Sequence, residues 1–138
     1  MADDTLFVEV VCADGRVWEG EARSVVARTT EGDIGILPRH EPILSVLVPC
    51  AAEILTTTGT EREIVAIDGG FISVADNRVS LISPHAALAK SISLYEAEAE
   101  LAKAQAALNQ GDIDDETRRH YNRALAQVLA AQKAGGKR

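Results

Sequence analysis

Aromatic residues are scarce in this chain of 138 residues, which holds two Phe, two Tyr and one Trp. A platform that binds sugars by stacking them on aromatic rings is therefore disfavoured. Hydrophobic residues nevertheless make up 46% of the chain, which is enough to form a core and argues against disorder. That core must consist mostly of Val, Ile, Leu and Ala.

Motifs that carry catalytic or metal-binding chemistry are also missing. The chain has no GxxxxGK[ST] phosphate-binding loop, no GxSxG elbow, no HExxH and no CxxC. Its three histidines, His40, His85 and His120, are far apart in the sequence. Cys12 and Cys50 each lie in an apolar, strand-like run and are expected to be reduced core thiols. We therefore expect no metal, no cofactor and no enzymatic activity.

An excess of basic residues and a long hydrophobic run are absent as well. The formal net charge is −7, and residues 1–90 carry all of it, because residues 91–138 hold seven acids and seven bases. An acidic body disfavours nucleic acid and anionic lipid as partners. The longest nearly apolar run, Ile43–Ala52, is about half of the ~20 residues that a spanning helix needs. With no apolar leader at the N-terminus, we expect a soluble chain that does not insert into a membrane.

The first half of the chain has the pattern of β-strands. Short runs rich in Val, Ile and Thr alternate with turn signals, which predicts an antiparallel sandwich or flattened barrel. Asp76 and Asn77 tolerate positive φ and predict a two-residue β-hairpin turn. Gly69-Gly70 is expected to form a tight turn or a bulge. The expected strands are Leu6–Cys12, Ser24–Thr30, Ile43–Val48, Glu53–Thr57, Ile64–Ile67, Phe71–Val74 and Val79–Ile82.

The second half has the pattern of two helices, at residues 93–109 and 114–134. Ser93 and Glu96 form a capping box at the start of the first helix, and Gly111 suits a left-handed position after its end. Asp112 or Asp114 is expected to cap the second helix. A short loop between two striped helices predicts an antiparallel pair. The predicted inward positions are Leu94, Ala97, Leu101, Ala104, Leu108, Tyr121, Leu125, Val128 and Gln132.

The sequence thus predicts an α+β protein without internal repeats. Residues 1–85 form an antiparallel β-sandwich, residues 86–90 a linker, residues 91–134 a helical hairpin, and residues 135–138 a basic tail.

One segment, EGDIGILPRHEPIL at residues 31–44, is unusually rich in Gly and Pro. By itself it reads as two strands joined by a rigid turn. It also resembles the EGxxGIxPxHxPxL signature of the epsilon subunit of bacterial F-type ATP synthases. The likeness resumes at DGGFISV (residues 68–74), similar to the SGGxxxV β-hairpin of that family, and covers nearly the whole chain. Arg39 stands where many members have Gly.

The resemblance implies a non-catalytic rotor subunit at the cytoplasmic face of the cell membrane. In that family the sandwich binds the gamma subunit and rests on the membrane c-ring. The helical hairpin either folds on the sandwich or extends along gamma toward the alpha–beta catalytic ring, where it inhibits ATP hydrolysis.

Individual residues take roles from the same resemblance. Arg118, Arg119 and Arg123 are candidate inhibitory contacts, although they could equally be an ordinary solvated helix face. The contacts within the helical hairpin, which are expected from the apolar spacing and not from the resemblance, would come from Leu94, Leu101, Leu108, Tyr121, Leu125 and Val128. The c-ring contacts would come from Glu31, Asp33, Ile34, His40 and Glu41.

Some members of the family hold ATP through an [IL]-D-x-x-R-A motif at the start of the first helix. Here the matching positions run from Ile92 to Ala97, with Ser93 in place of Asp and Glu96 in place of Arg. Arg123 matches a basic position that ATP-binding members use on the second helix. A carboxylate at position 96 repels phosphate where Arg would attract it, so we expect little or no ATP binding.

Two other functions stay open at this point. A stand-alone β-sandwich binding module would purify without a gamma subunit. A small enzyme would turn over a nucleotide as the isolated chain.

Overall fold

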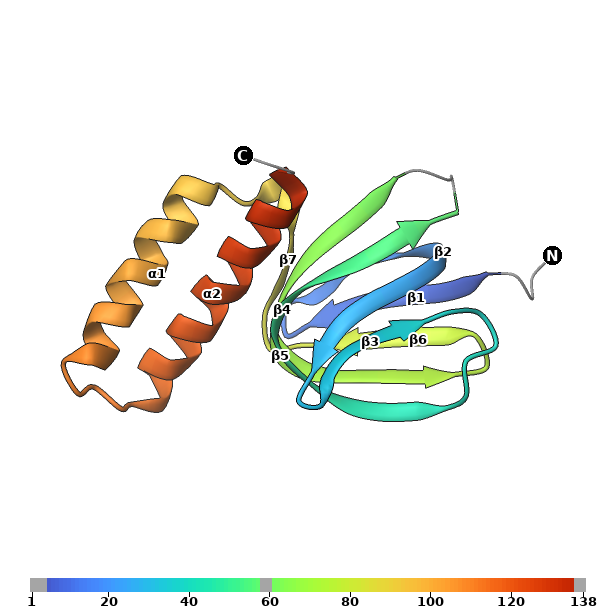
Figure 1. Ribbon diagram of the computed structural model, residues 1–138, viewed down its shortest axis with the longest axis horizontal. Coiled ribbons are helices and arrows are strands. Elements are labelled where there is room, and N and C mark those ends of the chain that lie inside the picture. The colour runs from blue at the N-terminus through green and yellow to red at the C-terminus, as the bar shows by residue number, and fades with distance from the viewer. Residues whose placement is uncertain (1–4, 58–60, 136–138) are drawn as a thin grey trace.

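The computed structural model describes residues 5–57 and 61–135. Within these residues, seven strands come first and two long helices follow (Figure 1). The strands are β1 (Leu6–Cys12), β2 (Gly15–Thr29), β3 (Gly32–Ile36), β4 (Ile43–Thr56), β5 (Arg62–Ala75), β6 (Arg78–Ile82) and β7 (Ala86–Leu88). A short 3₁₀ helix, η2 (Ala89–Ser91), leads to α1 (Leu94–Asn109) and α2 (Asp115–Gly135).

The strands close into a flattened barrel, which we call the sandwich. Their order is β1-β6-β5-β4-β2-β3, and β1 also pairs with β2, so five strands form a ring. All pairs are antiparallel except β1 and β6, which run parallel. Strand β3 extends the sheet beyond the ring on β2, and β7 pairs with β5. The predicted α+β fold, a sandwich followed by a helical hairpin, is confirmed.

The core of the sandwich comes from the period-two pattern of its strands. On β1, Leu6, Val8 and Val10 are fully buried, whereas the residues between them are partly exposed. The other strands contribute mostly Val, Ile, Leu and Ala to the same cluster. Buried Cys50 belongs to it and half-buried Cys12 packs against it, and both thiols are free. Both cysteines thus lie at the core, as expected.

Three strands are longer than their sequence pattern predicts. Strand β2 begins at Gly15 instead of Ser24, and β4 continues through Pro49. Strand β5 continues through Gly69 and Gly70 with the same register to β4 on either side, so the expected tight turn or bulge is wrong. Both glycines have positive φ, 111° and 117°; Gly70 pairs with Leu47 of β4, and the pairing continues at Asp68 and Pro49. Glycine adopts this conformation freely, which explains why a turn-like dipeptide lies inside a strand.

Residues 86–90 also differ from the expected linker. Ala86–Leu88 pair with Val65, Ala66 and Ile67 of β5 as an extra strand, and η2 follows directly. The three residues Ala-Ala-Leu are too short a pattern to distinguish a strand from a connection. Pairing with β5 fixes this segment to the sandwich.

The helix ends follow the capping chemistry predicted from the sequence. The Ser93 hydroxyl accepts a hydrogen bond from the backbone N–H of Glu96, at 3.2 Å. Gly111 has φ of 93° just after α1, as expected for a left-handed position. Of the two candidate aspartates at the next helix, Asp112 is the side chain that accepts, from the N–H of Asp114 at 3.0 Å.

The helical hairpin, α1 and α2, packs on one side of the sandwich. Figure 1 shows α2 between α1 and the strands, and α2 contacts β4 and β5. Small residues form this contact: Ala126 and Ala130 of α2 join Ile64, Ala66 and Ala89 in a second buried cluster. Alanine buries little apolar surface, so this contact is thin compared with the core of the sandwich.

Candidate functional site: a partner-binding sandwich with a docked helical hairpin

The segment expected to face the c-ring begins in the turn between β2 and β3. Thr29 shapes this turn, because its hydroxyl donates to the carbonyl of Gly32 at 2.9 Å and accepts from the N–H of Glu31 at 3.1 Å. Gly32 has φ of 115°, which few other residues adopt. The turn presents Glu31 to solvent.

Asp33, next to this turn, is paired within its own sheet. Arg28 lies opposite it on β2, and its Nε is 3.0 Å from Asp33 Oδ1. Both side chains are more than half exposed, so the pair is screened by water. Ile34 is half-buried and packs against the core, and Ile36 is fully buried. An approaching basic group would therefore have to share Asp33 with Arg28.

His40 and Glu41 lie beyond the opposite end of β3 from Glu31. The five residues of strand β3 separate the two groups. The loop that carries His40 instead lies against the β5–β6 turn, where the Arg39 N–H donates to Asn77 Oδ1 at 2.6 Å. Within this loop, His40 Nδ1 lies 2.7 Å from the carbonyl of Glu41.

Arg39 itself has φ of 69°. This left-handed conformation is the one that glycine adopts most easily, which accounts for the Gly that many members of the resembling family have here. The hydrogen bond from Arg39 to Asn77 helps to hold it. Asp76 and Asn77 also have positive φ, 52° and 62°, which confirms the predicted two-residue β-hairpin turn.

A row of exposed apolar side chains crosses the outer face of the sandwich. Val46 of β4 pairs with Phe71 of β5, and Phe71 pairs with Ile82 of β6. Directly paired residues share a face of the sheet, and these three are 46%, 49% and 48% exposed. Leu44, two residues before Val46 on the same face, is 73% exposed. We call Leu44, Val46, Phe71 and Ile82 the apolar row. Sequence reasoning did not single it out.

The helical hairpin buries alanine more completely than its larger residues. Leu94, Leu101 and Leu108 of α1 are half-buried, as are Tyr121 and Leu125 of α2. Val128 is buried, and Gln132, expected to face inward, is exposed. The fully covered positions of α2 are Ala124, Ala126, Val128 and Ala130. On α1, Ala97 and Ala104 are buried, as expected from the sequence. The alanine face of α2 was missed because alanine marks no hydrophobic stripe in an alanine-rich sequence.

A polar contact joins the two helices. His120 Nε2 of α2 lies 2.8 Å from Glu100 Oε1 of α1. This hydrogen bond, with Lys103 nearby as a smaller cause, lowers the pKa of the Glu100 carboxyl from its ordinary value. Glu100 is therefore ionised at neutral pH.

The degenerate ATP motif lines a hollow of about 230 Å³ between α1, α2 and the residues that precede α1. Glu96 and Glu100 both line it, together with Ser93 and Gln127. The Ser93 hydroxyl is engaged at the helix N-terminus. Of the described residues that line this hollow, none is Lys or Arg. The hollow therefore offers negative charge where a nucleotide would need positive charge.

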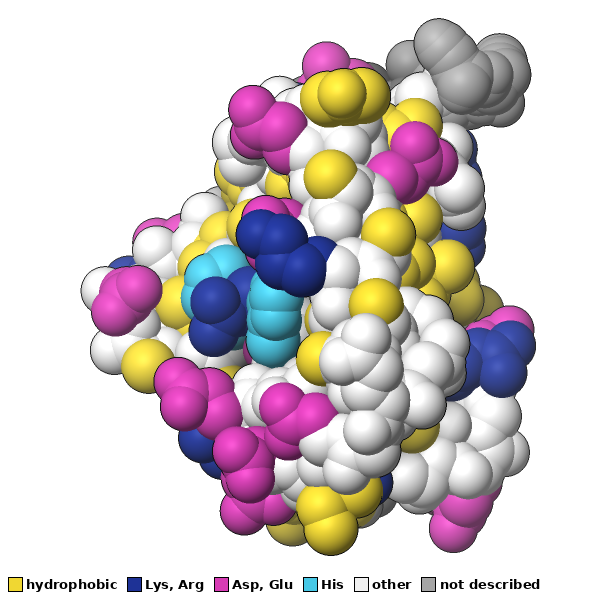
Figure 2. Space-filling view, turned by 90° about the vertical axis from the view of Figure 1, so that its left-hand side faces the viewer, with side chains coloured by type: hydrophobic (Ala, Val, Ile, Leu, Met, Phe, Trp, Pro, Cys, Tyr) yellow, Lys and Arg dark blue, Asp and Glu magenta, His cyan; other side chains and the backbone are white. Residues whose placement is uncertain are grey.

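Arg123 lines a different hollow, of about 430 Å³, together with Arg119, His120 and Thr117 of α2 and with the acidic Asp114 and Glu116. Figure 2 shows dark-blue and cyan side chains gathered on the face of the molecule that the helical hairpin forms. Among the described residues, no ion pair involves Arg118, Arg119 or Arg123. These arginines are exposed and available to an acidic partner.

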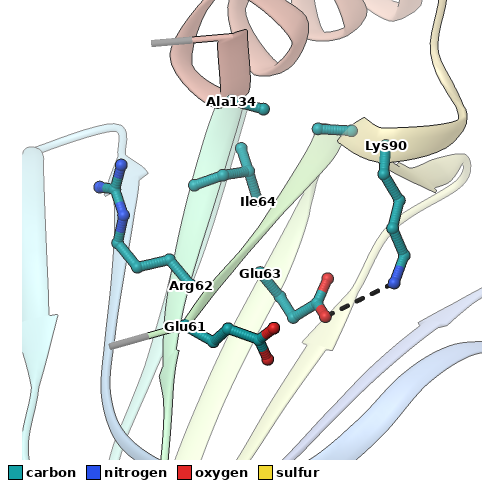
Figure 3. Close-up of a pocket in the computed structure, with 7 residues that line it drawn as sticks. Glu61, Arg62, Glu63, Ile64, Lys90 and Ala134 are labelled. Carbon is teal, nitrogen blue, oxygen red and sulfur yellow. Dashed lines mark ion pairs between the residues drawn. The ribbon is translucent and has the colours of Figure 1, made fainter. Parts of the chain in front are cut away.

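The linker meets the sandwich at a third hollow, of about 350 Å³, shown in Figure 3. Lys90 of η2 extends toward Glu63 of β5, and their charged atoms are 3.7 Å apart. Ile64 points toward the end of α2, near Ala134. This contact joins the start of the helical region to the sandwich.

Residues 5–57 and 61–135 lack two other kinds of feature. In these ranges, no group of three His, Cys, Asp or Glu side chains could hold a metal ion. No helix there is both long and apolar enough to cross a membrane.

Comparison with known proteins places this geometry in one class. Residues 5–89 match the family described as "ATP synthase, Delta/Epsilon chain, beta-sandwich domain". The ATP synthase epsilon chain of Cutibacterium acnes is 42% identical over 142 residues, which cover 96% of each chain. That of Streptomyces avermitilis is 50% identical over 113 residues, covering 82% of this chain and 88% of the relative. The chain belongs to the ATP synthase epsilon chain family.

Solved structures share the fold at low sequence identity. A chain of the Euglena gracilis mitochondrial ATP synthase, from a structure of OSCP, F1 and c-ring, has a TM-score of 0.73 at 22% identity. The match covers 96% of this chain and 81% of that one. A chain from the central stalk and c-ring of the Tetrahymena thermophila enzyme has a TM-score of 0.55 at 17% identity, covering 94% and 95%.

Proposed function

We propose that this epsilon subunit is a non-catalytic part of the rotor of a bacterial F-type ATP synthase. Its sandwich joins the gamma subunit to the c-ring, so that rotation driven by ion flow reaches the alpha–beta catalytic ring. The chain is held at the cytoplasmic face of the membrane by these partners. The observation that carries the proposal is the apolar row on the outer face of the sandwich.

The apolar row suits a stable protein partner. Phe71 lies at its centre and exposes about half of its surface, with Val46 and Ile82 directly beside it. Contiguous exposed apolar surface on a folded domain commonly marks a protein interface. We assign this face to gamma, the partner that turns with the sandwich and needs a contact that does not slip.

The turn between β2 and β3 suits the c-ring. Glu31 and Asp33 give it negative charge beside the thin apolar surface of half-buried Ile34. Polar loops with a basic residue, as the family's c-ring presents, would complement it. Such exposed charge pairs contribute about 0–1 kcal/mol each. They set orientation, while the strength of the contact comes from the apolar surface. His40 and Glu41 would contribute only if the ring also reached the far end of β3.

The helical hairpin supplies regulation in this proposal. Its thin alanine contact lets it leave the sandwich, and both helices have enough intrinsic propensity to persist when undocked. Arg118, Arg119 and Arg123 would then meet acidic groups of the catalytic ring and inhibit ATP hydrolysis. Their exposure and lack of ion-pair partners among the described residues support this role.

The experiment replaces the centre of the apolar row. Phe71→Asp should abolish co-purification of gamma with the tagged chain, because it places a charge inside an apolar contact. Ala75→Asp is the matched control, since Ala75 lies on the same strand and face but outside the row. Equal recovery of gamma with wild type and Phe71→Asp would refute the assignment of this face.

A further inference from the structure

We propose that the ion pair between Lys133 and Glu53 holds the helical hairpin on the sandwich and sets how often the hairpin undocks. The inference rests on the proposed function only in taking undocking to be regulatory. Lys133 lies in the last turn of α2, and its Nζ is 2.7 Å from Glu53 Oε2 on β4. The two residues are eighty positions apart in the sequence, and the fold alone brings them together.

This ion pair is a direct electrostatic contact between the helical hairpin and the sandwich. Of the ion pairs between described residues, it is the one that joins α1 or α2 to a strand. The Lys90–Glu63 pair joins η2 to β5. It lies before α1 and therefore does not hold α1 or α2 on the sandwich. The Glu100–His120 contact joins the helices to each other. Breaking the Glu53–Lys133 pair therefore acts on docking and on no other pair of the hairpin.

Because the apolar part of the docking contact is thin, this ion pair contributes much of the free-energy difference between the docked and undocked hairpin. Ala126 and Ala130 of α2 meet Ala66, Ala51 and Ile64 of the sandwich. Each methyl group buries little surface, so docking buries less apolar surface than a contact made of Leu or Ile would. In an equilibrium with a small free-energy gap, one ion pair shifts the populations measurably.

Glu53 also keeps a charged partner when Lys133 leaves it. Arg62 of β5 donates a second charged hydrogen bond to the same carboxylate, to Oε1. When Lys133 departs, Glu53 keeps this partner within its own sheet, so undocking does not leave an unpaired carboxylate at a half-buried site. Lys133 is 42% exposed and returns its ammonium to water. Neither charge blocks reversible undocking.

The test uses the isolated full chain and a thiol at the buried docking face. Ala130 is fully covered by the sandwich, so Ala130→Cys should react with a thiol reagent only when the hairpin undocks. Labelling is read on the peptide that carries position 130, so Cys12 and Cys50 stay in place. Ala126→Cys is a second reporter if the first perturbs docking.

Lys133→Met should speed labelling by about two- to fivefold, the factor that corresponds to an exposed or partly exposed ion pair. Lys103→Met is the matched control, because Lys103 pairs with Glu100 within α1, and it should leave the rate unchanged. Glu53→Gln should act like Lys133→Met, and the double variant should label no faster than either single variant.

Equal labelling rates of the Lys133→Met and Lys103→Met proteins would overturn the proposal. A double variant of Lys133→Met and Glu53→Gln whose labelling rate rises by the product of the two single effects would also overturn it. Both readouts come from the isolated chain and need no other subunit. A failure of the rotor assignment would appear instead in the co-purification of gamma, so the two failures are distinguishable.

Discussion

Arg28 and Asp33 form an ion pair across neighbouring strands, with 3.0 Å between Nε and Oδ1. The residue that we propose faces the c-ring is thus held in position by an arginine of its own sheet. Such a pair orients the Asp33 carboxylate and lowers its effective charge toward a partner.

The first prediction concerns this pair. Asp33→Lys should weaken binding of the c-ring, because it removes the attraction for the ring's basic loops and sets like charges opposite each other on β2 and β3. The stability of the isolated chain should fall by less than about 1 kcal/mol, since the pair is exposed. Binding is measured by recovery of the ring with the tagged chain.

Glu19→Lys is the matched control, since Glu19 also pairs with an arginine, Arg16, on an exposed face. It should leave ring binding unchanged. His40→Ala, beyond the far end of β3, tests whether the contact reaches that loop. Unaltered ring recovery with Asp33→Lys would contradict the assignment of the β2–β3 turn.

A second prediction concerns Gly70 in the middle of β5. An added Cβ there would lie 2.0 Å from the carbonyl oxygen of Ile82, and φ is 117°. Gly70→Ala should therefore cost about 3 kcal/mol or more in the free energy of unfolding. Gly15→Ala shares the positive φ but meets nothing within 4 Å, and should cost about 1 kcal/mol. Urea denaturation compares them, and equal losses would show that the close approach to Ile82 is unimportant.

The third prediction concerns pH. A hydrogen bond from Lys133, aided by Arg62, holds the pKa of the Glu53 carboxyl below its ordinary value of 4.5, although burial acts in the opposite direction. A lowered folded pKa contributes stability above the unfolded pKa, and this stability is lost as pH falls through the folded value. The stability difference between wild type and Glu53→Gln should be constant from about pH 6 to 8 and shrink in acid below about pH 4.5.

This difference is measured by denaturation at each pH. A Glu53→Gln effect that changes around neutral pH would show that another group controls it.

The fourth prediction is that ATP does not bind. Glu96 and Glu100 line the hollow at the degenerate motif, and their charges oppose a triphosphate. Calorimetry with the isolated chain should give no heat of binding at millimolar ATP. Ser93→Asp with Glu96→Arg should raise affinity, whereas Glu98→Arg, on an exposed part of α1, should not. Tight binding by wild type would overturn this prediction.

The sequence predicted features whose signal is local. The Asp76-Asn77 turn, the Ser93 cap and Gly111 each depend on residues within a few positions, and each is confirmed. Strand continuity could not be predicted in the same way. Gly69-Gly70 has the local chemistry of a turn, yet Gly70 pairs with Leu47 of β4, and Asp68 before it pairs with Pro49, which makes the dipeptide part of β5.

The candidate site depends even more on distant residues. The apolar row appears only when the register sets Val46, Phe71 and Ile82 side by side. Likewise, Glu53 and Lys133 carry no sign in the sequence of their contact. The signature at residues 31–44 indicated the family, but only the fold shows that β3 separates its two ends.

The central claim is that the sandwich couples the rotor and the hairpin restrains it. One measurement tests both, namely ATP hydrolysis and ATP-driven proton pumping in the same inverted membrane vesicles. The vesicles are depleted of this subunit and then supplied with the full chain or with residues 1–90, which retain the sandwich and its own core. Both should restore pumping, and residues 1–90 should give faster hydrolysis than the full chain. Pumping that is independent of this subunit, or hydrolysis unchanged by removal of the hairpin, would contradict the account.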